Sequence, residues 1–136
     1  MAFDWSNYLE LAKNLSNAAD EASLRTAVSR SYYCAYNLAL ARAKLNQYRP
    51  PPDNMGGIHE QLWELYGRNE TDEDCKFIAL WGPRMKRRRV KADYQLHYPA
   101  IQQEAKDAIE DAELCVAKLA ALPQGLPKDV PRRWSR

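Results

Sequence analysis

The chain has 136 residues, a hydrophobic fraction of 46%, a charged fraction of 28% and a formal net charge of +2. This length predicts one domain with a single modest core, and the near-neutral total argues against a uniformly basic coat for nucleic acid. Because no apolar run approaches the ~18 residues of a membrane span, and because the first residues lack a signal-peptide pattern, we expect a cytoplasmic protein without membrane contact.

The first helix is expected to begin at Asp4, whose carboxylate can accept hydrogen bonds from free backbone amides. Phe3 and Tyr8 occupy the two positions of a hydrophobic staple around this cap. Apolar residues then recur at helical spacing as far as about Ala18 or Ala19, which predicts that one face of this helix is buried.

A second helix, capped by Asp20 or Ser23, should continue to about Leu45, because neither glycine nor proline interrupts it. It is the longest predicted element, and one stripe along it should pack against the rest of the protein: Leu24, Val28, Ser31, Ala35, Leu38, Ala39 and Arg42. A second face carries three residues that either lie at the surface or line a cleft: Arg30, Tyr33 and Asn37.

Residues 48–57 contain three prolines and two glycines and are expected to form a loop. A short helix should follow over residues 58–66 and end at Gly67. It carries His59 near its start. A single histidine is more often structural or exposed than catalytic, and the sequence leaves both interpretations open.

The next helix begins in a capping box, Thr71-Asp72-Glu73-Asp74, and should be broken or kinked at Gly82-Pro83. A basic stretch then continues to about Tyr94. After a turn, Pro99 suits the first position of a last helix that should end near Leu122. The exposed side of this last helix is expected to be acidic: Glu104, Asp107, Glu110, Asp111 and Glu113.

These elements predict an all-α protein, an antiparallel up-and-down helical bundle of four long segments plus one short helix. The bundle is expected to occupy residues 1–122. Residues 123–136, which are rich in proline and arginine, are expected to form a flexible tail.

The basic stretch is the strongest functional signal, since six of the eight residues from Arg84 to Lys91 are cationic. Such a cluster can bind a polyanion by releasing condensed counterions, or its cations can pair with acids of neighbouring helices. In the first case the nucleic-acid-binding residues would be Arg84, Lys86, Arg87, Arg88 and Lys91, with Arg30 on the second helix.

Arg89 is a candidate phosphate clamp, because a guanidinium group matches two phosphate oxygens. Asp93 lies four residues later, at the right distance to orient the Arg89 side chain on a helix. The alternative is an ordinary surface ion pair. RNA can be cleaved without a metal when an acid, a base and fixed positive charge surround the phosphate.

No metal or cofactor is expected. The sequence has no glycine-rich phosphate loop, no His-x-x-x-His pair and no Glu-x-x-His signature. Cys34, Cys75 and Cys115 are widely spaced and predict small buried side chains, neither a zinc site nor a disulfide framework.

Three stretches of the sequence resemble the HEPN family, small helical domains of prokaryotic defence, toxin–antitoxin and RNA-processing systems. They lie in residues 3–12, in 29–36 with the pattern Ser-Arg-x-Tyr-Tyr, and in 88–94 with the pattern Arg-x-x-Ala-Asp-Tyr. His59 also falls where several relatives carry a histidine before the short third helix.

The resemblance implies a homodimer in which paired Arg-(four to six residues)-His motifs cut RNA without a metal. Arg89 matches the arginine of this motif, whereas Tyr94 stands where the histidine is expected. A phenol, with a pKa near 10, transfers protons poorly at neutral pH. His97 could take over this role, although its separation from Arg89 lies outside the pattern.

Two hypotheses follow. The first is a homodimeric RNA-binding protein and candidate endoribonuclease, with Arg89, Asp93, Tyr94 and His97 as its catalytic residues. The second is a non-catalytic interaction module that docks a partner protein. Some HEPN proteins are silenced by a nucleotidyltransferase-type antitoxin that modifies a tyrosine near the motif, and here Tyr94 or Tyr98 would be the candidate.

Overall fold

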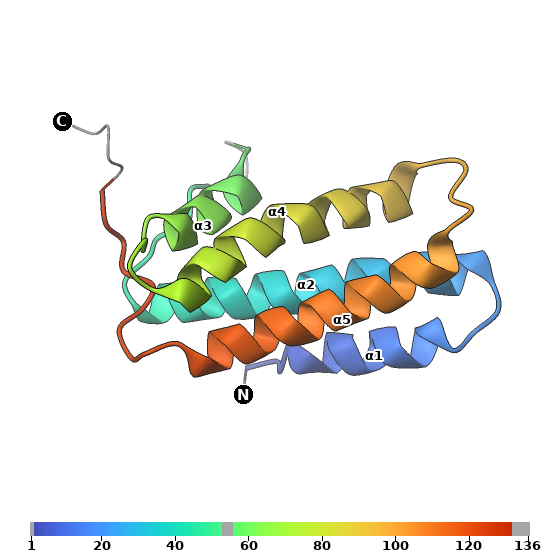
Figure 1. The fold of residues 1–136 in the computed structure, drawn as a ribbon, viewed down its shortest axis with the longest axis horizontal. Helices are drawn as coiled ribbons and strands as arrows, with labels where there is room; N and C mark the ends of the chain where they lie inside the picture. Colours follow the sequence, from blue (N-terminus) through green and yellow to red (C-terminus); the bar gives the residue numbers. More distant parts are fainter. Residues whose placement is uncertain (1, 53–55, 132–136) are drawn as a thin grey trace.

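The computed structural model describes residues 2–52 and 56–131. Within these ranges the chain forms helices and no strand. The elements are α1 (Ser6–Ser16), α2 (Glu21–Leu45), α3 (Ile58–Gly67), α4 (Glu73–Tyr94) and α5 (Ile101–Ala121). The four long helices run alternately up and down, and the short α3 lies beside the first half of α4 (Figure 1). The predicted all-α bundle is confirmed.

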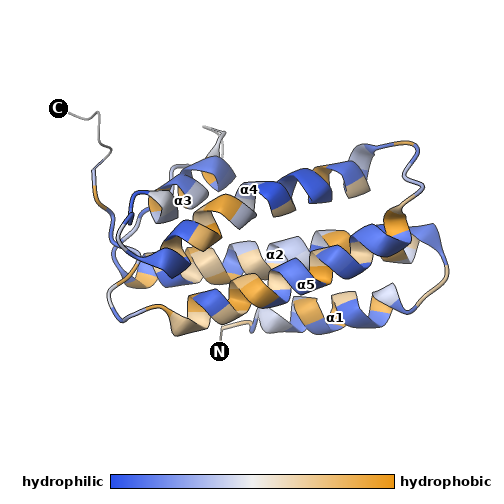
Figure 2. Cartoon of the chain, viewed as in Figure 1, coloured by the Kyte–Doolittle hydropathy of each residue, from blue (hydrophilic) through white to orange (hydrophobic). Residues whose placement is uncertain are grey.

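The helix α2 forms the centre of the bundle, since it packs against α1, α4 and α5. Its buried side is rich in alanine, which lets the neighbouring helices approach closely. One part of the core gathers around Trp63 and Tyr66 of α3, and the other fills the space between α1, α2 and α5. Hydrophobic residues accordingly line the inner faces of the helices, whereas the second half of α4 is strongly hydrophilic (Figure 2).

The N-caps of the two longest helices are carboxylates. Asp20 accepts a hydrogen bond from the Ser23 amide at 2.9 Å, and Asp72 accepts one from the Cys75 amide at 2.8 Å. Asp4 binds the amide and the hydroxyl of Ser6, one residue ahead of the N-cap position. The predicted starts of α1, α2 and α4 therefore agree with the structure to within about two residues.

A break or a kink is predicted at Gly82-Pro83, and the break is wrong, because α4 continues through both residues. Gly82 is buried, and a side chain there would overlap the indole ring of Trp63. The bare backbone at this position therefore allows α3 to place Trp63 directly against α4. This contact fixes the position of the short helix.

Where the structure describes it, the segment after α5 is held by hydrogen bonds to the bundle. Arg42 donates hydrogen bonds to the carbonyl groups of Leu119, Leu122, Pro123 and Leu126 at 2.8–3.0 Å. Further along, Arg68 and Asn69, which directly follow α3, donate to the carbonyls of two more residues, and Pro127 is buried. The described part of the predicted tail is therefore joined to the bundle by hydrogen bonds, and its last five residues lie outside the described ranges.

Within the described ranges, none of the helices is long and apolar enough to cross a membrane. All three cysteines are free and buried, as predicted. Burial raises the pKa of each thiol, to about 11 for Cys34 and about 12 for Cys75 and Cys115. They are therefore protonated at neutral pH and serve as core residues.

Candidate nucleic-acid interface

Three of the six cations in the basic stretch have an acidic partner. Arg88 points toward α5 and forms ion pairs with Glu104 and Asp111, both at 2.8 Å. Lys86 pairs with Glu60 of α3 at 2.8 Å, and Arg89 pairs with Asp93 at 3.1 Å. The expected pairing with acids of neighbouring helices therefore occurs, but it involves only half of the stretch.

The other three cations, Arg84, Arg87 and Lys91, are exposed and form no ion pair or hydrogen bond with any residue that the structure describes. They recur at spacings of three and four along α4 and so share one side of it. We call them the basic stripe. They line a hollow of about 170 Å³ together with Arg88, Tyr98 and Glu104. This hollow is cationic on the α4 side and suits an anion.

Arg30 makes a different contact. Its guanidinium group lies 5.0 Å from the ring centre of Tyr8, so the side chain is placed against α1. This contact places Arg30 beside α1 and apart from the cations of α4 with which it was grouped in the sequence.

Arg89 is held tightly in a mostly buried position, with 12% of its side chain exposed. Its guanidinium group lies 5.8 Å from the ring centre of Tyr32 and 5.4 Å from that of Tyr33, both on α2. Asp93 binds Nη1, as the spacing predicts, while Nε is buried and has no hydrogen-bond partner among the described residues. The orientation of Arg89 is therefore fixed from two sides, and one donor is left unused.

His59 lies in the same cluster as Arg89. Its Nδ1 atom is 2.6 Å from the hydroxyl of Tyr32, and its ring stacks on Tyr36 at 4.0 Å. Burial, followed by the charges of Lys86 and Arg89, lowers the pKa of His59 to about 4. The imidazole is accordingly neutral at pH 7.

The tautomer of His59 follows from its neighbours. The indole of Trp63, which can only donate, lies 3.4 Å from the Tyr32 hydroxyl. Tyr32 then accepts from Trp63 and donates to Nδ1 of His59, which leaves the imidazole proton on Nε2. In this arrangement His59 can donate a hydrogen bond to an anion, but its lone pair is already engaged.

Sequence reasoning missed Tyr32, Tyr36 and Trp63 as members of this cluster. Tyr32 and Tyr36 lie one helical turn apart, so their spacing predicts a shared face. Nothing in the sequence, however, indicates that α3 brings His59 onto this face from 27 residues away.

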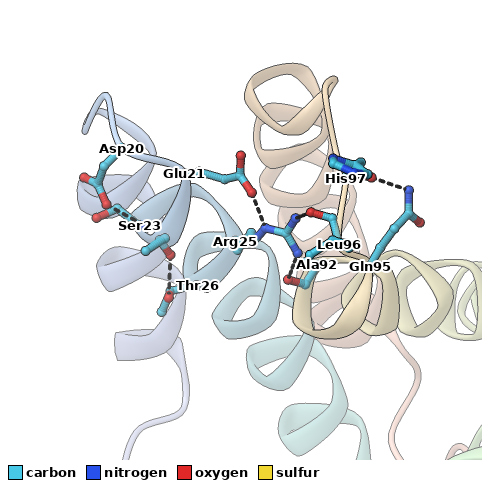
Figure 3. Close-up of polar contacts among 10 residues, drawn as sticks. Asp20, Glu21, Ser23, Arg25, Thr26, Ala92, Gln95, Leu96 and His97 are labelled. Carbon is cyan, nitrogen blue, oxygen red and sulfur yellow. Dashed lines mark hydrogen bonds and ion pairs between the residues drawn. The ribbon is translucent and has the colours of Figure 1, made fainter.

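Tyr94 and His97 have no described contact with Arg89. Tyr94 is 77% exposed at the end of α4, and His97 is exposed in the following loop. Figure 3 shows how this loop is held: Arg25 of α2 donates to the carbonyls of Ala92 and Leu96 at 3.0 and 3.3 Å. The structure therefore does not bring these two predicted proton carriers to Arg89 within one chain.

A larger groove lies between α3 and α4, with a volume of about 1,050 Å³. Its α3 side carries Glu60 and Glu64, and its α4 side carries Lys86, Arg87 and Lys91. The groove and the hollow thus share two residues of the basic stripe, on opposite flanks of α4.

The lowered pKa of His59 predicts a dependence of stability on pH. The unfolded chain binds a proton near pH 6.5, whereas the folded protein does so only near pH 4, so stability falls as the pH drops across this range. In urea unfolding at pH 7.0, 5.5 and 4.5, His59→Gln should lose less stability on acidification than the wild type. His97→Gln, at an exposed position, should follow the wild type; a parallel loss in all three proteins would contradict the prediction.

Among the described residues, no group of three or more histidine, cysteine, aspartate or glutamate side chains could hold a metal ion. The candidate site combines guanidinium, ammonium, phenol and imidazole groups with the carboxylates of Asp93 and Glu104. Comparison of the chain with protein-family models, with curated proteins and with solved structures finds no match.

Proposed function

We propose that this protein binds RNA as a homodimer and that the basic stripe of α4 contacts the phosphates. The resemblance to HEPN domains noted above suggests the same class of partner. The observation that carries the proposal is the division of the cations: Arg88 neutralises two acids of α5, while Arg84, Arg87 and Lys91 have no described acidic partner. Exposed cations around a hollow attract phosphates and release their counterions.

The proposal of a homodimer is supported by large hydrophobic side chains that are exposed along and just after α4. They are Leu80, Val90, Tyr94 and Leu96. Their exposure favours self-association, because a second copy would remove this apolar surface from water. A dimer formed there would bring two copies of the basic stretch near each other.

The salt dependence of RNA binding tests the proposed contact. Affinity for a fluorescent single-stranded RNA should fall linearly on a log–log plot against salt, with a slope of about −0.7 for each phosphate neutralised. Replacing Arg84, Arg87 and Lys91 by glutamine should flatten this slope by about 2 and weaken binding by about one to two orders of magnitude.

A matched control removes the same charge elsewhere. Lys44, Arg49 and Lys106 are also exposed, and their replacement by glutamine changes the net charge equally. This variant should keep the wild-type slope. Equal losses in both variants would show a general charge effect and refute a role for the stripe. Sedimentation at the concentrations of the titration gives the oligomeric state of each protein.

Metal-independent cleavage of RNA is a second candidate function, and the geometry of Arg89 favours it. A fixed guanidinium group that keeps part of its side chain exposed, next to a neutral imidazole that can donate from Nε2, suits the stabilisation of a crowded phosphate. These groups do not supply the general base that removes the proton from the 2′-hydroxyl. Tyr94 and His97 remain the candidates for it, and a second protomer would have to deliver them.

Incubation with RNA in EDTA tests cleavage. The wild type should cut single-stranded RNA, and Arg89→Ala should abolish cutting while binding falls only mildly, because Arg89 is mostly buried and lies outside the stripe. Tyr94→Phe and His97→Gln separate the two candidate proton carriers. Intact RNA at every wild-type concentration would refute the nuclease.

The alternative of a non-catalytic module that docks a partner protein is favoured by the groove between α3 and α4. Such a module would bind RNA weakly and with little dependence on salt. For a nucleotidyltransferase-type antitoxin, exposure favours one of the two candidate tyrosines. Tyr94 is 77% exposed, whereas Tyr98 is 7% exposed and its hydroxyl is buried.

A further inference from the structure

Four side chains on α4 and α5 form a continuous stack that ends at the basic stripe. The Lys118 ammonium group lies 5.3 Å from the ring centre of Phe77, and Phe77 stacks on Trp81 at 4.5 Å with an angle of 18° between the rings. The guanidinium group of Arg84 lies 4.6 Å from the ring centre of Trp81. We call these four residues the stacked column.

The column has a fixed base and an exposed end. Lys118 is tied to Asp74 of α4 by an ion pair at 3.3 Å, so the bottom of the column is joined to both helices. Phe77, Trp81 and Arg84 follow one another at spacings of four and three, which places them on one face of α4. Arg84 is exposed, while Phe77 and Trp81 are partly covered.

The support from Trp81 matters for Arg84, because a guanidinium group is flat. A free arginine side chain samples many orientations, whereas stacking on an indole holds the plane of the group in place. Arg84 can then offer its other flat side to a planar ligand. Unpaired nucleobases stack on arginine planes and on aromatic rings in just this way.

Resting on the proposed function, we propose that the stacked column is a platform for an unpaired base and that the partner is single-stranded RNA. A base would stack on Arg84, and the adjoining phosphates would reach Arg87 and Lys91, which lie up to seven residues or about 10 Å further along α4. In a duplex both faces of each base are already covered by neighbours, so the platform would stay unused.

Three ligands of equal length distinguish stacking from charge: a single-stranded RNA, the same backbone without bases, and an RNA duplex. Fluorescence anisotropy with the full chain should show the tightest binding to the single strand. Arg84→Lys keeps the charge but removes the plane, and Trp81→Leu removes the support. Each should weaken binding to the single strand by about tenfold and leave binding to the abasic backbone unchanged.

Arg49→Lys is the matched control, because it makes the same exchange at an exposed position outside both the column and the basic stripe. It should change binding to either ligand by less than about twofold. Arg84 is exposed, so Arg84→Lys tests the platform even if Trp81→Leu disturbs the fold. Equal losses on both ligands, or equal affinity for the duplex, would overturn the platform while the salt dependence still supported RNA binding. Absence of binding to all three ligands would overturn both proposals.

Discussion

Replacing Gly82 by alanine is expected to lower the free energy of unfolding by about 3 kcal/mol, or the melting temperature by roughly 10 °C. The reason is steric. A Cβ atom at this position would overlap the six-membered ring of Trp63, which is almost completely buried. An indole ring cannot move aside in a close-packed core without displacing its neighbours.

The sign of the change in stability shows whether the packing of Trp63 or intrinsic helix propensity dominates at position 82. Intrinsic helix propensity alone favours alanine over glycine by about 1 kcal/mol, so it predicts stabilisation. Gly67→Ala is the matched control, since Gly67 is also helical but its added Cβ would lie 3.4 Å from the Cβ of Ala79, which is close to ordinary contact. Thermal unfolding should show a loss for Gly82→Ala and little change or a gain for Gly67→Ala. Stabilisation in both would refute the packing of Trp63 on α4.

The same substitution links the core to the candidate site. Trp63 donates to Tyr32, and Tyr32 in turn binds His59. A displaced indole would remove the donor that orients the Tyr32 hydroxyl, so Gly82→Ala is expected to disturb His59 as well as the stability of the fold. Any change in RNA binding by Gly82→Ala has to be compared at a temperature where both proteins remain folded.

The helices were predictable because their signals are local. The capping carboxylates Asp20 and Asp72 and the apolar spacing within each helix depend on neighbours a few residues away. Pro83 misled the prediction for the same reason. A proline costs one backbone hydrogen bond, and the packing of Trp63 on α4, which holds the helix together there, is a contact between different helices.

The candidate site was predictable only in part. The pair of Arg89 and Asp93 follows from a spacing of four residues on a helix. Which cations of the basic stretch stay unpaired depends on where α5 places Glu104 and Asp111, and the sequence offers no measure of that. The position of His59 beside Tyr32 likewise depends on the packing of α3.

The end of α5 shows most clearly that contacts between distant residues cannot be predicted from the sequence. Its last residues were predicted to within one position, but the segment that follows is held by Arg42, a residue about 80 positions earlier. Arg42 was expected on the packing stripe of α2, yet its partners are backbone carbonyls that carry no sequence signal. The sequence of this segment, rich in proline and polar residues, therefore gives no indication that Arg42 binds its backbone.

Arg42→Met is expected to lower the free energy of unfolding by about 3 kcal/mol. The guanidinium group binds four carbonyls at 2.8–3.0 Å, one at the end of α5 and three in the segment that follows. Those of Leu119 and Pro123 also accept a backbone amide, whereas no backbone donor is described for those of Leu122 and Leu126. Methionine fills similar space but donates nothing. A hydrogen bond to a charged group contributes about 1.5–3 kcal/mol net, and the contributions of four bonds from one guanidinium group do not add, because the freed carbonyls can bind water.

A local measurement separates this mechanism from a general loss of stability. Hydrogen exchange should speed up in residues 122–130 of Arg42→Met before it does so in α2 or α4, because the segment loses its principal donor. In Arg42→Lys the exchange rate of this segment should lie between those of the wild type and Arg42→Met, since an ammonium group can reach fewer carbonyls than a guanidinium fork. Arg49→Met, an exposed change, should leave exchange unaltered. A uniform increase in exchange along the whole chain of Arg42→Met would show that Arg42 acts on the core as a whole and not through this segment.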